Sequence, residues 1–292
     1  MNFDRYIKVI MFLFLVSLQA CSKNLDTSID IEMNLPDDSI TLQTKTIYIS
    51  QNIDGNVVLR PVIIQTPNVI NPDINYPIVF AFHGRGGSNI NWVNQLKAFT
   101  DAGDFIGIYP QGFLQSWNLG QEPSTADDVA FVNLIIEEIS NYPNLNLNKM
   151  YALGLSNGSG MVNKLGIETS HFKAIAPIVS QLMESIPILP NTQPISVYQV
   201  NGAVDDIIPI NGGPIFGHVF LNAYESAESW ANNFECDASP ETISQGVNTL
   251  YIFKSCNGNK EIRYLRIENA GHNLFSTTAG LMNNIWMFFQ RY

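Results

Sequence analysis

Charge is scarce in this sequence of 292 residues. Only 14% of the residues are charged, compared with about 25% in an ordinary globular protein. Acidic residues outnumber basic ones, 26 against 15, which gives a formal net charge of −11. No cluster of lysine and arginine interrupts this acidic excess, so a nucleic-acid backbone or an anionic membrane surface would be repelled. We therefore expect no nucleic-acid partner.

A hydrophobic run long enough to span a membrane is missing from the N-terminal region. The apolar segment 9–18 follows Arg5 and Lys8 and is about half of the ~20 residues that a transmembrane helix needs. Its short length and basic flank are typical of an export signal. We therefore predict a signal peptide at residues 1–20.

The end of this segment resembles a bacterial lipobox, in which a small residue precedes a cysteine that is lipidated and becomes the new N-terminus. The residues are Leu18-Gln19-Ala20-Cys21. We predict lipidation of Cys21, followed by an acidic tether to residue 40 and a catalytic domain at 41–292. The alternative is an ordinary secretory signal with a chance cysteine. On both interpretations the protein is exported, either anchored by lipid on the periplasmic or cell-surface face of a membrane, or secreted.

Cysteine is rare as well, with three residues in the chain. If Cys21 is lipidated, Cys236 and Cys256 remain, and an oxidising compartment permits them to form a disulfide. Both lie beside polar residues typical of loops, which favours a bridge over the alternative of two buried thiols.

Short β-rich apolar runs alternate with helical patterns along the rest of the chain. Strands are expected at 46–49, 57–65, 78–82, 105–109, 150–153, 174–179, 195–200, 250–254 and 262–267. Helices are expected at 89–102, 127–139, 159–169, 221–234 and 277–290. The first two strands form an antiparallel pair, and the later strands are expected to pair in parallel because whole helices separate them. The sequence predicts an α/β protein with a mostly parallel central sheet, an antiparallel N-terminal edge and helices on both faces.

A candidate nucleophile lies between the predicted strand 150–153 and the helix that follows it. The segment is Gly154-Leu155-Ser156-Asn157-Gly158. An abrupt strand-to-helix turn leaves no room for bulk on either side of the strained serine, and the two glycines provide that room. The turn places Ser156 at a helix N-terminus, where developing negative charge is favoured. A plain glycine-containing turn is the alternative.

A serine hydroxyl needs a neighbouring base, and His272 is the favoured candidate among four histidines. It lies in a loop after a predicted strand and completes the chain order serine, acid, histidine. The loop after strand 195–200 supplies two acids, Asp205 and Asp206, and spacing alone does not choose between them.

The glycine-rich turn 83–88 after strand 78–82 is a candidate oxyanion site. We assign the two backbone donors to Arg85 and Asn157. A dinucleotide-binding fingerprint would need a further glycine at Asn89, so no nucleotide is expected there. No metal-binding motif occurs either, and we expect neither a metal nor another cofactor.

The chain resembles the polyhydroxybutyrate depolymerase and feruloyl esterase-like family of secreted α/β-hydrolases, from about residue 44 to 292. The resemblance rests on the turn 83–88, the segments 116–118, 127–131, 154–158 and 201–213, the two later cysteines, and Gly271-His272. It implies the α/β-hydrolase fold and serine esterase activity, with Ser156 as nucleophile, His272 as base and Asp205 as acid. It also supports the bridge between Cys236 and Cys256.

The sequence departs from the family pattern at three places that are expected to line the substrate cleft: Asn201, the segment 119–123 and Leu274. Feruloyl or acetyl esters of polysaccharide, or short hydroxyalkanoate esters, are the expected substrates. Crystalline polyester is less favoured because the chain ends at Tyr292 without a polymer-binding domain. Trp117 and His83 are predicted substrate contacts, with Trp92 as a weaker candidate. A noncatalytic glycan-binding lipoprotein on a hydrolase scaffold is the rival interpretation.

Overall fold

The computed structural model describes residues 41–276, 278 and 280–292. The predicted signal peptide, the predicted lipidation site Cys21 and the predicted tether to residue 40 lie outside the described residues. The α-helices are α1 (Ile90–Ala102), α2 (Asp128–Ile139), α3 (Asn157–Glu168), α4 (Ala223–Asn233) and α5 (Leu281–Phe289). The strands are β1 (Lys45–Ile53), β2 (Asn56–Gln65), β3 (Tyr76–Phe82), β4 (Ile106–Pro110), β5 (Leu145–Leu155), β6 (Ala174–Ile178), β7 (Ser196–Gly202), β8 (Gly213–Ile215), β9 (His218–Phe220), β10 (Glu241–Gln245), β11 (Asn248–Cys256) and β12 (Lys260–Ile267).

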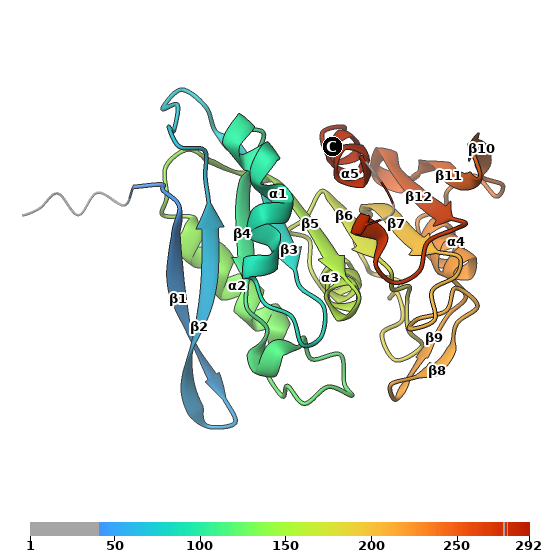
Figure 1. Ribbon diagram of the computed structural model, residues 1–292, viewed down its shortest axis with the longest axis horizontal. Coiled ribbons are helices and arrows are strands. Elements are labelled where there is room, and N and C mark those ends of the chain that lie inside the picture. The colour runs from blue at the N-terminus through green and yellow to red at the C-terminus, as the bar shows by residue number, and fades with distance from the viewer. Residues whose placement is uncertain (1–40, 277, 279) are drawn as a thin grey trace, which may run out of the picture. The chain divides into compact units, whose positions relative to one another are not determined.

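One large twisted sheet organises the fold (Figure 1). Its strand order is β1-β2-β4-β3-β5-β6-β7-β12-β11-β10. The strands from β4 to β12 in this order pair in parallel. These central strands are almost wholly buried and read as continuous apolar runs, as strands covered on both faces do.

Helices cover the sheet on both faces. One hydrophobic core joins α2, α3 and α4 to the side chains on one face, among them the fully buried Phe80, Ile175 and Val197. A second core joins α1 and α5 to the opposite face, through residues such as Val79 and Leu153. Neighbours along β3 thus point to different cores, because successive side chains of a strand alternate between faces. The predicted α/β architecture with an antiparallel N-terminal edge is confirmed.

The other edge of the sheet differs from the prediction. β10 and β11 pair antiparallel, and β11 and β12 also pair antiparallel. The expectation that all later strands are parallel is therefore wrong at this edge. No α-helix separates these strands, and their short connections permit only antiparallel pairing. The prediction also missed β8, β9 and β10. The side chains of β10 are all exposed, so it has no buried apolar pattern to reveal it.

Cys236 and Cys256 form the predicted disulfide, which ties the end of α4 to the end of β11. Within residues 41–276, 278 and 280–292, no helix combines the length and the apolar character that a membrane span requires.

Candidate active site

Ser156 lies in a strained turn between β5 and α3. Its backbone has φ 57° and ψ −118°, a conformation that residues with a side chain rarely adopt. The Ser156 N–H donates to the carbonyl of Ile178 at 2.9 Å, and the Ser156 carbonyl accepts from Ser159 N–H at 2.9 Å. The strain is therefore held by hydrogen bonds to the neighbouring strand and to the first turn of the helix.

The two glycines beside Ser156 make this turn possible. A Cβ atom at Gly154 would lie 2.1 Å from the carbonyl oxygen of Gly158. A Cβ atom at Gly158 would lie 2.2 Å from the carbonyl oxygen of Phe82. Both distances are far shorter than a normal contact, so any side chain at either position would force the backbone apart. The sequence pattern predicted this steric demand.

Asp205 and His272 meet in the loops after β7 and β12. The Oδ2 atom of Asp205 lies 2.8 Å from Nδ1 of His272. The other carboxylate oxygen, Oδ1, accepts hydrogen bonds from the N–H groups of Ile207 and Ile208, each at 2.9 Å. These two bonds fix the carboxylate toward the histidine, while Asp206 is exposed. The geometry thus favours Asp205 over the alternative that the spacing left open.

The sheet brings this pair to the same edge as Ser156. The strands β5, β6, β7 and β12 are parallel neighbours, and the three residues follow the carboxyl ends of β5, β7 and β12. The His272 side chain is 23% exposed. In the described part of the chain, no hydrogen bond joins the Ser156 hydroxyl to His272. Such contacts are often long in an enzyme without substrate and shorten when substrate binds.

The turn 83–88 lies against the serine. A Cβ atom at Gly84 would be 3.4 Å from Cβ of Ser156. Gly86 N–H donates to the carbonyl of Gln115 and Gly87 N–H to that of Gly84, so two amides of the turn are satisfied. Among the described residues, the backbone N–H groups of Arg85 and Asn157 have no hydrogen-bond partner. Two donors beside Ser156 are thus left for another acceptor.

The side chain of His83 supports the turn 83–88 through hydrogen bonds. Its side chain is buried. Nε2 accepts the N–H of Gly112 at 3.0 Å, and Nδ1 lies 2.8 Å from the carbonyl oxygen of Gly84. Because a backbone amide can only donate, Nε2 is the acceptor and Nδ1 carries the proton. Burial lowers the pKa of His83. The predicted substrate contact at His83 is wrong, because both ring nitrogens are occupied by the backbone.

Trp117 is part of the same support, not a surface platform. It is 0% exposed, and its ring packs edge-on against Phe82 with centroids 5.0 Å apart. Its indole N–H donates to the carbonyl of His83 at 2.8 Å, and its backbone N–H donates to Oδ1 of Asn157 at 2.7 Å. The predicted aromatic platform at Trp117 is therefore wrong. Trp92 is buried too and packs against Phe275.

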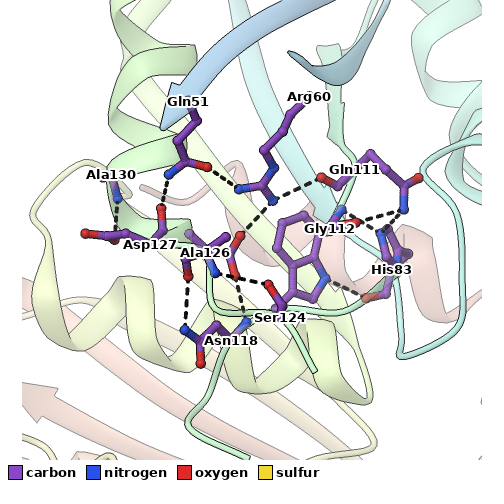
Figure 2. A network of polar contacts seen from close by, with 12 residues as sticks. Gln51, Arg60, His83, Gln111, Gly112, Asn118, Ser124, Ala126, Asp127 and Ala130 are labelled. Carbon is purple, nitrogen blue, oxygen red and sulfur yellow. Dashed lines mark hydrogen bonds and ion pairs between the residues drawn. The ribbon is translucent and has the colours of Figure 1, made fainter. Parts of the chain in front are cut away.

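A buried ion pair anchors the segment that carries Trp117 (Figure 2). Arg60 Nη2 lies 2.7 Å from Asp128 Oδ1, and the two side chains are 2% and 0% exposed. The other oxygen of Asp128 accepts the N–H of Asn118 at 2.7 Å. Arg60 also donates to the carbonyl of Gln111 and to the side chain of Gln51. The pair therefore fixes both ends of the segment 111–118 beneath the turn 83–88.

A second buried polar cluster, which was not predicted from the sequence, contacts Asn157. Oε1 of Glu122 lies 3.0 Å from Nε2 of His218 and accepts from Nδ2 of Asn157 at 3.2 Å. The side chains of His218 and Glu122 are only 4% and 5% exposed. The available signal was that His218 directly precedes the apolar residues Val219 and Phe220, since a polar side chain that is buried needs a hydrogen-bond partner.

A cavity of about 240 Å³ opens between these clusters. Its polar lining comes from Arg85, Glu122, Asn157, Ser180 and His218. The remaining lining is apolar: Leu119, Met183, Ile207, Ile208, Phe216 and Phe220. A partly open cavity with a few polar groups and mostly apolar walls is typical of a small-molecule site.

Comparison with known proteins supports a hydrolase scaffold. No protein-family model matches the chain. The sequence is 26% identical over 234 residues to feruloyl esterase B of Piromyces equi, covering 73% of this chain and 42% of that protein. It is 24% identical over 251 residues to a bifunctional acetylxylan esterase/xylanase of Neocallimastix patriciarum, covering 78% of this chain and 33% of that protein. The chain thus spans less than half the length of these two relatives.

Among solved structures, the acetyl xylan esterase from Aspergillus awamori matches with a TM-score of 0.59 at 17% sequence identity. The match covers 84% of this chain and 99% of that chain. The chain therefore has the α/β-hydrolase fold, as its sheet order and the turn at Ser156 also indicate, and its sequence resembles those of feruloyl and acetylxylan esterases.

Proposed function

We propose that this chain is an exported serine hydrolase of carboxylic esters. The observation that carries the proposal is the hydrogen bond between Asp205 and His272, on the same sheet edge as the strained turn of Ser156. The similarity to a feruloyl esterase and an acetylxylan esterase supports ester hydrolysis as the reaction class. It also supports feruloyl or acetyl groups on polysaccharide as substrates, with short hydroxyalkanoate esters as a further class.

The chemistry assigned to these residues is acyl transfer in two steps. Ser156 attacks the ester carbonyl while His272 Nε2 accepts the hydroxyl proton, and His272 then returns this proton to the departing alcohol. Water hydrolyses the resulting acyl-enzyme with the same histidine as base. Asp205 holds Nδ1–H and stabilises the imidazolium that forms, which agrees with its short contact to Nδ1.

The oxyanion of the tetrahedral intermediate is assigned to the amides of Arg85 and Asn157. Their N–H groups lie on the two sides of the Ser156 turn, in the turn 83–88 and at the first position of α3. Donors that are fixed before the reaction stabilise developing charge without reorganisation. The ion pair of Arg60 and Asp128 supports this role, because it holds the segment 111–118, which contacts the turn 83–88.

Export belongs to the same proposal. The apolar segment 9–18 and the lipobox-like residues before Cys21 support a signal peptide and a lipid anchor. The disulfide between Cys236 and Cys256 agrees with an oxidising compartment. Metabolic labelling with a radioactive fatty acid tests the anchor, since Cys21→Ala should abolish incorporation.

Ser156→Ala is the decisive test of the reaction. We expect hydrolysis of p-nitrophenyl acetate to fall by at least roughly a thousandfold, while circular dichroism shows an unchanged fold. A fluorophosphonate probe should label the native protein and not the variant. Ser159→Ala is the matched control, because Ser159 is buried and its hydroxyl donates to the carbonyl of Ser180. Full turnover by Ser156→Ala would overturn the assignment.

A further inference from the structure

Glu122 is a buried carboxylate that the proposed chemistry does not use. Its side chain is 5% exposed, and its ion-pair partner is His218. In the part of the chain that the structure describes, no lysine or arginine is paired with it. A buried carboxylate without such a partner is costly unless hydrogen bonds stabilise it. The groups that form these bonds therefore indicate what Glu122 holds in place.

Four nitrogen atoms surround the carboxylate. Oε2 accepts from the backbone N–H groups of Leu119 at 2.7 Å and Gln121 at 3.2 Å. Oε1 accepts from Nδ2 of Asn157 at 3.2 Å and lies 3.0 Å from Nε2 of His218. The first two bonds close the loop 119–122 on itself. The other two connect this loop to the start of α3 and to the start of β9.

The side chain of Asn157 is bonded at both of its polar atoms. Oδ1 accepts the backbone N–H of Trp117 at 2.7 Å, and Nδ2 donates to the carbonyl of Trp117 at 3.0 Å as well as to Glu122. Trp117 is itself 0% exposed and fixed by its indole N–H, which donates to the carbonyl of His83. Asn157 is thus held between a buried backbone segment and a buried carboxylate.

The backbone of Asn157 carries one of the two proposed oxyanion donors. Asn157 is the first residue of α3 and directly follows Ser156, whose backbone is strained. A side chain bonded at both polar atoms restricts the rotation of its own backbone, so the bonds to Trp117 and Glu122 fix the direction of the Asn157 N–H. Donors that are fixed before charge develops stabilise an oxyanion without reorganisation.

We propose that Glu122 is a positioning residue for ester hydrolysis, which orients the backbone N–H of Asn157 toward the oxyanion through the Asn157 side chain. The inference rests on the proposed function, in which this N–H is an oxyanion donor. His218 contributes by holding the carboxylate from the hairpin of β8 and β9. Loss of Glu122 should therefore slow the chemical steps and leave ester binding nearly unchanged.

The first test measures kcat and KM of Glu122→Ala with p-nitrophenyl acetate. Formation and hydrolysis of the acyl-enzyme both pass through an oxyanion, so kcat should fall about tenfold to a hundredfold whichever step limits the rate. KM should change by less than about twofold, because the lost interaction acts in the transition state. Active sites are counted by complete labelling with a fluorophosphonate probe, so unfolded molecules do not enter kcat.

Glu184→Ala is the matched control. The side chain of Glu184 is exposed, and its backbone N–H donates to the carbonyl of Val219 in the same hairpin. This variant should keep the wild-type kcat. A wild-type kcat in Glu122→Ala, or an equal loss in the two variants, would overturn the inference.

A trifluoromethyl ketone distinguishes loss of positioning from a general loosening of the fold. Ser156 Oγ adds to the ketone carbonyl, the hydroxyl proton passes to His272, and the carbonyl oxygen becomes an oxyanion in the place it takes during ester hydrolysis. The inhibition constant of this compound should rise in Glu122→Ala by the same factor by which kcat/KM falls. An unchanged inhibition constant would contradict the positioning role.

Asn157→Ala keeps the backbone N–H and removes the side chain through which Glu122 acts. Its kcat should fall by a similar factor, and adding Glu122→Ala to it should cause no further loss. Losses that multiply in the double variant would overturn the inference. If Glu122→Ala does not fold, a wild-type kcat in Asn157→Ala would overturn it alone. No turnover of any ester by the wild type would overturn the proposed function as well.

Discussion

The two sides of the candidate site are built differently. On the oxyanion side, which comprises residues 83–88, 111–118 and 154–158, His83 and Trp117 are buried and their ring nitrogens bond to backbone groups. Arg60 and Asp128 anchor this side from within the core. On the acid–base side, residues 201–208 and 267–273, Asp205 is fixed but His272 is partly exposed and has one contact to the acid.

The difference follows from what each side must do. Backbone donors stabilise an oxyanion best when they are fixed before charge develops, because no reorganisation is then needed. A general base has to take up a proton and release it again, so it must reach both the nucleophile and the leaving group. Changes on the acid–base side should therefore remove activity and spare stability, and changes on the oxyanion side should reduce stability.

Asp205→Asn should give the largest effect. Loss of the carboxylate removes the group that holds the histidine tautomer, and we expect kcat to fall by roughly a thousandfold to ten-thousandfold. The asparagine oxygen can still accept from the N–H groups of Ile207 and Ile208, so urea unfolding should change little. Asp206→Asn is the control and should retain activity. Equal losses in the two variants would break the distinction between the paired acid and its exposed neighbour.

Asp128→Asn tests the oxyanion side. The change leaves the Arg60 guanidinium buried without its counter-charge, which should lower the free energy of unfolding by about 3 to 5 kcal/mol. Asp127→Asn is the matched control, because Asp127 is exposed and caps α2 by accepting from Ala130 N–H. Asparagine caps helices equally well, so this control should change stability by less than about 0.5 kcal/mol. Chemical unfolding of both variants measures the contrast, and similar values would contradict the anchoring role of Asp128.

Titration of His83 should give the smallest effect, a change in the free energy of unfolding that depends on pH. Burial lowers the pKa of His83 in the folded protein, while the unfolded chain protonates it near its ordinary pKa of about 6.5. The unfolded state therefore binds more protons below this pH, and the free energy of unfolding falls as pH decreases. Above the ordinary pKa both states are neutral and the effect disappears.

Between about pH 7.5 and pH 5.5, this group should contribute a loss of up to about 1.4 kcal/mol. His83→Gln removes the titrating group, so its stability should fall less steeply with pH than that of the wild type. Urea unfolding at the two pH values measures both slopes. Parallel slopes would mean that protonation of His83 does not weaken the support of the turn.

Local pattern predicted the elements of the fold where one face or both faces of a segment are apolar. The central strands and the five α-helices of the described residues fall in segments with such patterns. The strand prediction missed β10 because none of its side chains is buried. The antiparallel pairing of β11 with β12 follows from a connection too short for a crossover, and the seven residues between the expected strands 250–254 and 262–267 already indicated it.

In the candidate site, too, local pattern predicted some features, and others depend on contacts between distant segments. Ser156 stood out because its flanking glycines mark a turn with no room for side chains, and His272 stood out by its order in the chain. The predictions for Trp117 and His83 failed because an aromatic residue near a motif can either pack in the core or contact a ligand. Only its burial in the folded structure distinguishes the two roles. The contact of Glu122 with His218 joins residues 96 positions apart, so no local pattern could reveal it.

By itself, the sequence determined the α/β layering, the turn that carries Ser156 and the order of the candidate catalytic residues, because each depends on local periodicity or on steric limits between near neighbours. Only the tertiary structure decided which polar side chains are buried and what lines the cavity, and its contact between Asp205 and His272 agrees with the acid that the family resemblance already implied. Those properties depend on distances between segments remote in the chain, and these distances exist only once the sheet has aligned the carboxyl ends of its strands.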